Sequence, residues 1–255
     1  MRFGAYARYY DLLYRDKPYE DEASYVLELA RRSGGATGSL LELGVGTGGH
    51  AVHFARTSQA VFGVDMSQAM LDAAEDRKRS LEPSLSARLT LIPGDVRTVR
   101  LNQRFSLVVS MFHVASYQTT NDDLMAMFRT ARAHLDVGGV FVFDVWYGPG
   151  VLTEPPTVRV KRFADANTAV ERIAEPALHP RENTVDVNYA IRVTDLATGS
   201  SEVIQEQHRM RYLFEPELVH FLSNASLEFV NAVSWMRFEP PTLDDWTAGI
   251  IARAV

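Results

Sequence analysis

Residues 40–49 read LLELGVGTGG, a glycine-rich loop between a short apolar strand pattern and a helix pattern. Glycine is required where a chain turns sharply or where the backbone must lie close to a ligand. The N-terminus of the following helix offers unpaired N–H groups to a polar or anionic group. This loop therefore predicts a cofactor site at the end of a strand.

Two cofactor classes fit the loop. The stretch from Gly44 to Gly49 has the G-x-G-x-x-G spacing of dinucleotide sites, and Asp65 lies about twenty residues on, where a ribose-binding acid belongs. This spacing predicts an NAD(P)-dependent oxidoreductase. The stretch from Glu42 to Gly48 instead has the spacing E-x-G-x-G-x-G. Because a carboxylate inside a strand is costly to bury without a partner, Glu42 is expected to satisfy polar groups near the loop. The loop alone leaves both classes open.

Strand and helix patterns alternate around this loop. A helix is expected at 121–135, ended by Gly138 and Gly139. The first five strand patterns lie at 39–43, 60–64, 89–92, 105–111 and 140–145. A helix at 215–225 and two closing strands at 227–235 and 247–253 follow later. This order predicts an α/β fold with a doubly wound, Rossmann-like, mainly parallel seven-stranded sheet.

The pattern changes after about residue 150. Four β-rich segments follow one another without helices between them, at 157–163, 169–174, 184–194 and 202–212. Such a series predicts an added antiparallel β layer. We therefore expect three parts: a helical preamble and cofactor-binding core at 1–150, an auxiliary sheet at 151–212, and a C-terminal helix with closing strands at 213–255.

Composition limits the function classes. The chain has 255 residues, 46% of them hydrophobic, and a net charge of -6, which predicts a globular protein without the basic face of a nucleic-acid binder. The absence of cysteine excludes disulfides and cysteine chemistry. No apolar stretch reaches the ~18 residues of a membrane span, and the N-terminus has no apolar signal region, so a cytoplasmic enzyme is expected. His50 and His53 lack further ligands, so no metal site is predicted.

Four segments occur in a characteristic order: GVGTGGH, VFGVDMSQAML, PGDVRTVRL and FSLVVSMFHVASY. Together they resemble the class I S-adenosylmethionine-dependent methyltransferases. The tyrosine-rich segment YARYYDLLY is similar to that of the branch that includes the deoxyaminosugar N,N-dimethyltransferases. The resemblance covers about residues 5–147, with Val45 in place of the usual Ala or Cys.

The resemblance implies that the cofactor is S-adenosylmethionine. Asp65 would accept hydrogen bonds from both ribose hydroxyls, since a carboxylate takes two donors at once, and Met66 would cover the adenine. Asp95 would accept from the adenine amino group, with Val96 beside it. The glycines would line the methionine and ribose portion. The complete set of cofactor-binding candidates is Glu42, Gly44, Gly46, Gly48, Asp65, Met66, Asp95, Val96 and Met111.

The catalytic candidates are His113 and Tyr14. His113 follows the fourth strand, and a histidine can remove a proton from an alcohol or an ammonium near neutral pH; a purely structural histidine at this strand end is the open alternative. Tyr14 could close over the cofactor or hydrogen-bond the acceptor. The substrate-binding candidates are Trp146, Tyr147, His208, Arg209 and Arg211.

Alternation along a strand places Arg209 and Arg211 on one face and His208 on the other. Paired arginines suit a phosphate or carboxylate, although solvated surface charges give the same pattern.

The sequence thus predicts methyl transfer to an oxygen or nitrogen of a small polar acceptor, a nucleotide-linked sugar among the options. An NAD(P)-dependent oxidoreductase would need a hydride-transfer pair such as Y-x-x-x-K, which we do not find. A non-catalytic binding protein with the same cofactor fold is the third option. We expect neither nucleic acid nor membrane as a partner. The added β layer could pair with a copy of itself in a homodimer.

Overall fold

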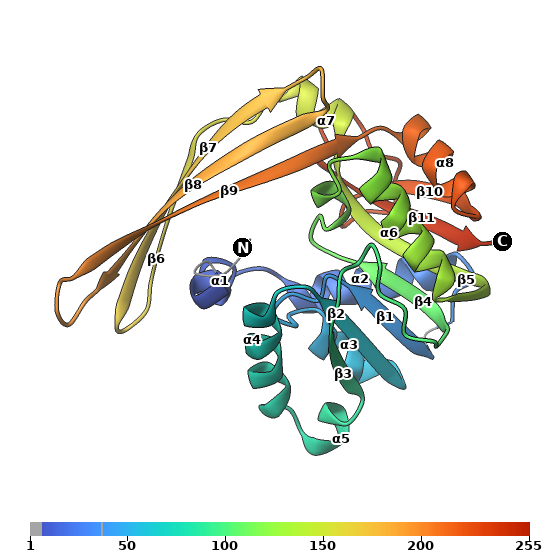
Figure 1. The fold of residues 1–255 in the computed structure, drawn as a ribbon, viewed down its shortest axis with the longest axis horizontal. Coiled ribbons are helices and arrows are strands. Elements are labelled where there is room, and N and C mark those ends of the chain that lie inside the picture. The colour runs from blue at the N-terminus through green and yellow to red at the C-terminus, as the bar shows by residue number, and fades with distance from the viewer. Residues whose placement is uncertain (1–6, 37) are drawn as a thin grey trace.

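The computed structural model describes residues 7–36 and 38–255 (Figure 1). At its centre, five parallel strands run in the order β3-β2-β1-β4-β5. Strand β11 continues the sheet antiparallel to β5, and β10 pairs with β11. Their bounds are β1 Ser39–Leu43, β2 Ala60–Asp65, β3 Leu89–Pro93, β4 Phe105–Ser110, β5 Leu135–Tyr147, β10 Leu227–Ser234 and β11 Thr247–Ala254. The predicted seven-stranded Rossmann-like sheet is confirmed.

Helices cover both faces of this sheet. Successive strand residues alternate between two apolar clusters, as Leu40 and Leu41 do, because both faces are buried. One cluster includes side chains of α2 Tyr19–Arg32, α3 Ala51–Thr57 and α4 Gln68–Arg79. The other includes side chains of α6 Asn121–Ala133 and α8 Glu215–Asn224. The shorter helices are α5 Pro83–Ser86, α7 Gly148–Thr153 and the 3₁₀ turn η1 Ala115–Tyr117. None of the described helices is long and apolar enough to span a membrane.

A four-stranded antiparallel layer extends from the end of β5. It consists of β6 Arg159–Ala164, β7 Thr168–His179, β8 Thr184–Asp195 and β9 Ser201–Leu213. Strand β9 joins the core through Trp146–Tyr212 and Tyr147–Leu213 pairs. Figure 1 shows this layer reaching outward above helix α1, Ala7–Leu13. Leu13 packs on the inner face of the layer beside Val170 and Ile191, so α1 fills the space between the layer and the core.

Two sequence expectations need correction. Helix α6 ends at Ala133, and β5 already begins at Leu135, so Gly138 and Gly139 lie within the strand. The cause is a bulge, since the pairing with β4 is interrupted over this stretch and Gly138 has φ 77°. Strand β7 continues beyond the predicted end at Ala174, through Pro176. Proline is tolerated there because β6 no longer pairs with β7.

We predict that Phe143→Ala lowers the free energy of unfolding by about 3–5 kcal/mol, because it removes a fully buried ring and leaves a cavity. Urea unfolding followed by circular dichroism would measure the loss. Val137→Ala in the same strand is the control, since that side chain is 81% exposed and should change stability by less than about 0.5 kcal/mol. Equal effects of the two substitutions would contradict this assignment of the core.

Candidate functional site

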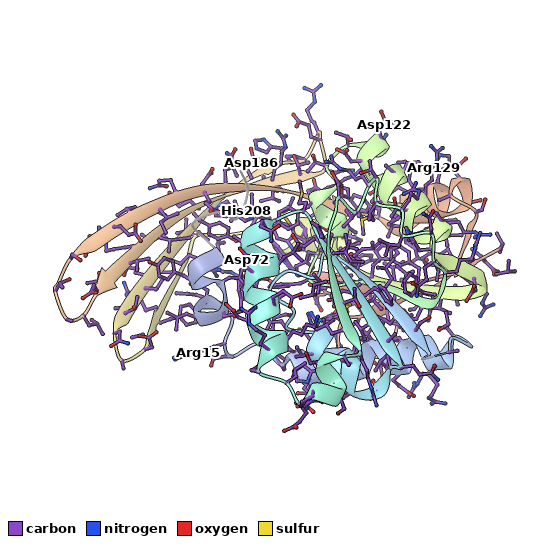
Figure 2. All side chains as sticks on the ribbon, turned by 60° about the horizontal axis from the view of Figure 1, so that its bottom comes forward. Arg15, Asp72, Asp122, Arg129, Asp186 and His208 are labelled. Carbon is purple, nitrogen blue, oxygen red and sulfur yellow. The ribbon has the colours of Figure 1, made fainter. Side chains whose placement is uncertain are left out.

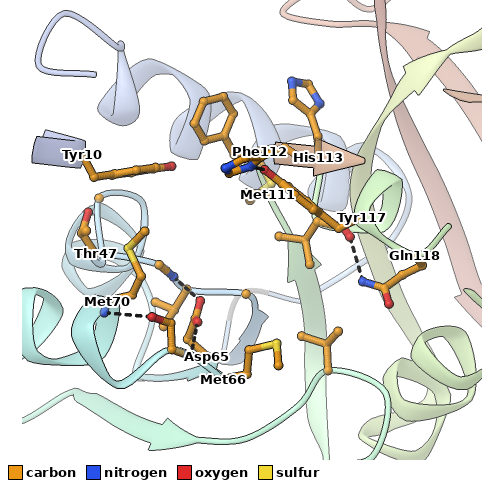
Figure 3. Close-up of a pocket in the computed structure, with 18 of the residues that line it drawn as sticks. Tyr10, Thr47, Asp65, Met66, Met70, Met111, Phe112, His113, Tyr117 and Gln118 are labelled. Atoms are coloured by element: carbon orange, nitrogen blue, oxygen red, sulfur yellow. Dashed lines mark hydrogen bonds between the residues drawn. The ribbon is translucent and has the colours of Figure 1, made fainter. Parts of the chain in front are cut away.

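A cavity of about 830 Å³ lies where the parallel strands end, beneath α1 and the inner face of the antiparallel layer (Figure 3). This is where doubly wound sheets bind ligands, and its volume suits a cofactor-sized molecule. Predicted site residues in its lining are Tyr14, Gly44, Gly46, Asp65, Met66, Asp95, Val96, Met111, His113, Trp146 and His208. Predicted site residues outside its lining are Glu42, Gly48, Tyr147, Arg209 and Arg211.

The glycine loop and Asp65 are joined directly. The N–H of Gly46 donates to Oδ2 of Asp65 at 2.9 Å, and the N–H of Ser67 donates to Oδ1 at 2.9 Å. Burial raises the pKa of Asp65, although these backbone hydrogen bonds partly offset the effect. Gly44 has φ 83°, and a Cβ there would lie 2.5 Å from the side chain of Val114. The loop thus requires glycine at this position and presents bare backbone beside a carboxylate.

The second predicted acid, Asp95, lines the same cavity and pairs with Arg97. Val96, Met66 and Met111 lie in the lining as well, and Figure 3 shows Met66 beside Asp65. Two carboxylates, a bare backbone turn and apolar side chains therefore meet around one space. This set can accept hydrogen bonds from hydroxyl and amino groups and can cover a flat ring.

Glu42 lies behind the loop and is 1% exposed. Its Oε1 is 3.8 Å from Nδ1 of His50, and its Oε2 has no hydrogen-bond partner among the described residues. Burial, together with the negative charge of Asp65, raises the pKa of Glu42 well above its usual value. The Glu42 carboxyl therefore favours the protonated form and can act as a hydrogen-bond donor to its surroundings.

No binding role was predicted for His50 or Tyr19 from the sequence, yet both line the cavity. His50 Nε2 lies 2.7 Å from Glu22, which also pairs with Lys17. The Tyr19 ring lies against Gly49, where a Cβ would come within 2.5 Å of it, and its hydroxyl is buried without a partner among the described residues. The signal in the sequence was Gly49, because a residue without Cβ at this position leaves room for the Tyr19 ring.

Helix α1 is fixed over the glycine loop by polar contacts. Thr47 Oγ1 donates to Asp11 at 2.7 Å, and Arg77 pairs with Asp11 at 2.8 Å. Directly after the C-terminal end of α1, the Tyr14 hydroxyl accepts a hydrogen bond from Arg172 at 3.0 Å. The Tyr14 ring meets Phe112 edge-on, with 5.0 Å between ring centroids. These contacts bring Tyr14 to the cavity.

His113 and Asp144 form a close pair at the end of β4. The backbone N–H of His113 donates to Oδ1 of Asp144 at 3.0 Å, and its Nδ1 lies 2.8 Å from Oδ2, at an angle short of a straight hydrogen bond. Burial alone would raise the pKa of Asp144, but the charge and hydrogen bonds of His113 outweigh it, so that this pKa lies below its usual value.

Phe112 and His113 both have left-handed backbones, with φ of 64° and 65°. Such residues cost on the order of 1–3 kcal/mol each and persist where the surroundings hold them. Figure 3 places both across the cavity from Asp65 and Met66. The cavity therefore has an acidic end near the loop and a histidine–aromatic end opposite.

The antiparallel layer contributes His208 to the cavity, while the neighbouring arginines lie elsewhere. His208 Nδ1 is 2.7 Å from the Tyr117 hydroxyl. Arg209 lies on the other face of the layer and pairs with Glu182, and Figure 2 shows His208 and Asp186 on opposite faces. Arg211 is 6% exposed and pairs with Glu217 of α8 at 2.9 Å. The idea that paired arginines bind an anionic acceptor in this cavity has no support from the geometry.

In the described part of the chain, histidines and acids form no group of three that could hold a metal ion.

Comparison with known proteins agrees with the family resemblance seen in the sequence. Residues 40–139 match the family model of a methyltransferase domain. The chain is 38% identical over 146 residues to a dTDP-3-amino-3,4,6-trideoxy-alpha-D-glucopyranose N,N-dimethyltransferase of Streptomyces venezuelae, over 56% of this chain and 58% of that protein. It is 30% identical over 209 residues to a dTDP-3-amino-3,6-dideoxy-alpha-D-glucopyranose N,N-dimethyltransferase of Streptomyces fradiae, over 81% of this chain and 77% of that protein.

Solved structures agree on the fold. Streptomyces venezuelae DesVI has a TM-score of 0.80 at 25% identity, with 98% of each chain covered. An S-adenosylmethionine-dependent methyltransferase from Clostridium acetobutylicum ATCC 824 has a TM-score of 0.81 at 22% identity, with 98% of each chain covered. The similarity therefore includes the antiparallel layer as well as the Rossmann-like core.

We predict that the stability difference between the wild type and Glu42→Gln depends on pH. Because the folded-state pKa of Glu42 is raised above its usual value of 4.5, the folded protein keeps a proton that the unfolded chain loses. Wild-type stability relative to Glu42→Gln should therefore fall as pH rises from 4.5 through the raised pKa. Urea unfolding of both proteins at a series of pH values above 4.5 would measure this difference in stability. Parallel stability profiles would show that Glu42 is not held in its protonated form.

Proposed function

The chain belongs to the class I S-adenosylmethionine-dependent methyltransferases, and from this membership we propose that it methylates the amino group of a nucleotide-linked deoxysugar. Its cofactor is S-adenosylmethionine, so the glycine loop serves methyl transfer rather than an NAD(P)-dependent oxidoreductase, and the chain is an enzyme. The observation that carries the acceptor proposal is that His113, on the cavity wall opposite the acidic end, is paired with the buried Asp144.

The lining residues fit this cofactor, which supplies a methyl group on a positively charged sulfur. We assign Asp65 to the ribose hydroxyls and Asp95 to the adenine amino group, because carboxylates accept from such donors. A Cβ at Gly46 would meet no atom within 4 Å, which leaves open space for a ligand against the backbone. The buried Tyr19 hydroxyl needs a partner, and we assign it to the polar end of the methionine portion.

At the opposite end, we assign His113 as the proton acceptor. A sugar amine is largely protonated at neutral pH and must lose a proton before its lone pair can act as a nucleophile. Nδ1 of His113 faces the Asp144 carboxylate at 2.8 Å, so Nε2 is the ring nitrogen left to serve the acceptor. Aromatic side chains of Tyr14, Phe112 and Trp146 line this end and keep water away from the reacting nitrogen. Orientation of the two reactants supplies the rest of the catalysis, since it can lower the barrier by ~7–11 kcal/mol in well-held pairs.

The names of the relatives support two successive methylations of one nitrogen. Each methylation leaves a cationic nitrogen, so His113 must remove a proton in each round. A cytoplasmic location, a homodimer and the lack of a nucleic-acid partner stay predictions from the sequence.

The central experiment incubates the purified protein with S-adenosylmethionine and dTDP-linked 3-amino-deoxyhexoses, and follows the acceptor by mass spectrometry. We expect the mass to rise by one and then two methylene units. Asp65→Ala is the control without a functional cofactor site and should give no product. Binding of S-adenosylhomocysteine with no methylation of any aminosugar would remove the acceptor proposal while keeping the cofactor.

We predict that His113→Ala lowers kcat by about a hundredfold or more, the usual contribution of a general base, and leaves S-adenosylhomocysteine affinity unchanged. Asp144→Asn should lower kcat less and alter the pH–rate profile, because it changes the orientation of the ring and not the base itself. His179→Ala, on the outer face of the antiparallel layer, is the matched control and should leave kcat unchanged. Full activity of His113→Ala would exclude this residue from proton transfer.

A further inference from the structure

Arg97 forms a bidentate contact with the carboxylate of Asp95. Nε of Arg97 donates to Oδ1 of Asp95 at 2.9 Å, and Nη2 donates to Oδ2 at 2.6 Å. The backbone N–H of Arg97 donates to the same Oδ1 at 2.9 Å. The planar guanidinium matches a carboxylate in this way, whereas the ammonium of lysine is a single point of charge. The plane of the Asp95 carboxylate is therefore fixed.

The other end of the guanidinium is anchored to α6. Nη1 of Arg97 donates to Oδ1 of Asp123 at 2.7 Å, and Thr120 Oγ1 donates to Oδ2 of Asp123 at 2.9 Å. The hydroxyl of Thr130, which is fully buried, donates to the backbone carbonyl of Arg97 at 2.9 Å. Both the side chain and the main chain of Arg97 are thus hydrogen-bonded to α6. Because Arg97 in turn binds Asp95, these contacts also restrict the movement of the Asp95 carboxylate.

Asp95, Arg97 and Asp123 all line the same cavity, so two carboxylates face one guanidinium and this end keeps a negative excess. On Asp95, Oδ1 already takes two N–H donors. Oδ2 takes the strong contact from Nη2 and only a longer one of 3.1 Å from Nε. A carboxylate offers about four acceptor sites. The single Nε–H is shared and lies nearer Oδ1, so Oδ2 is the oxygen with capacity for another N–H donor. A carbonyl oxygen in the same place would be repelled.

The hydrogen bonds from Arg97 also lower the pKa of Asp95 below its usual value. Asp95 is therefore ionised, and acceptor-only, throughout the working pH range. This is the state that favours an amino group over a carbonyl.

We propose that Arg97 is a positioning residue that makes the cofactor site selective for a 6-aminopurine over a 6-oxopurine. It acts through Asp95, by fixing the carboxylate plane so that Oδ2 faces the exocyclic amino group, and Asp123 is its anchor. The inference rests on the proposed assignment of Asp95 to adenine, but it needs no acceptor molecule.

The test measures dissociation constants of S-adenosylhomocysteine and S-inosylhomocysteine by isothermal titration calorimetry. The wild type should prefer the adenosine compound by roughly tenfold or more, the value of a hydrogen bond to a charged group. Arg97→Ala should lose most of this preference, through weaker binding of the adenosine compound alone. Arg97→Lys keeps the positive charge but cannot form the paired hydrogen bonds of a guanidinium. Its preference should therefore lie between that of the wild type and that of Arg97→Ala. Asp123→Asn should reduce the preference while Arg97 and Asp95 stay intact.

Arg129→Ala is the matched control, since it removes an exposed guanidinium of α6 that lies outside the cavity lining. Its preference should equal that of the wild type. Circular dichroism and the unfolding midpoint verify the fold, and Arg97→Lys carries the test if Arg97→Ala does not fold. Two outcomes would overturn the inference: tighter or unchanged binding of S-adenosylhomocysteine to Arg97→Ala, or equal weakening of both ligands. A protein that shows the predicted loss of preference but methylates no aminosugar would refute only the proposed acceptor.

Discussion

The cavity depends on how closely the end of β2 lies against the glycine loop. The N–H of Gly44 donates to the carbonyl of Val64 at 2.8 Å, and the N–H of Gly46 donates to the next side chain, Asp65, at 2.9 Å. Only a residue without Cβ can take the left-handed backbone of Gly44 and still approach Val114. One set of short contacts therefore closes the strand rim, orients a buried carboxylate and leaves bare backbone toward the cavity.

The antiparallel layer encloses the cavity from the side opposite the strand ends. A parallel sheet alone is open beyond its strand ends, and ligands there remain in contact with water. Because β5 extends beyond β4, its last residues have an open edge, and β9 pairs with it through Tyr212 and Leu213. That pairing places His208 over the cavity. Helix α1 packs on the layer through Leu13, and Tyr14, which follows it, closes the remaining side. Enclosure of the cavity is thus a consequence of the different lengths of β4 and β5.

The sequence was most informative where a local pattern and a backbone requirement coincide. The strands, the loop from Gly44 to Gly49 and the acid at Asp65 follow from period, glycine spacing and position. The sequence could not predict contacts between elements that lie far apart along the chain. Alternation correctly separated His208 from Arg209, yet which face meets the cavity depends on how the layer docks. The role of Arg97 was invisible for the same reason, since its anchor Asp123 lies on another element.

The two ends of the cavity differ in electrostatics in a way that suits a sulfonium reaction. At one end N–H donors hold the carboxylates of Asp65 and Asp95 in place, and the hydrogen bonds from Arg97 lower the pKa of Asp95 and keep it ionised. At the other end His113 sits on a strained backbone that the buried carboxylate of Asp144 holds in place. Were that carboxylate absent, the backbone N–H of His113 would lose its acceptor and the imidazole would lose the charge beside Nδ1. The strained backbone at Phe112 and His113 therefore sets where the His113 imidazole, the proposed proton acceptor, lies relative to the cofactor site, because a relaxed turn would take a different path out of β4.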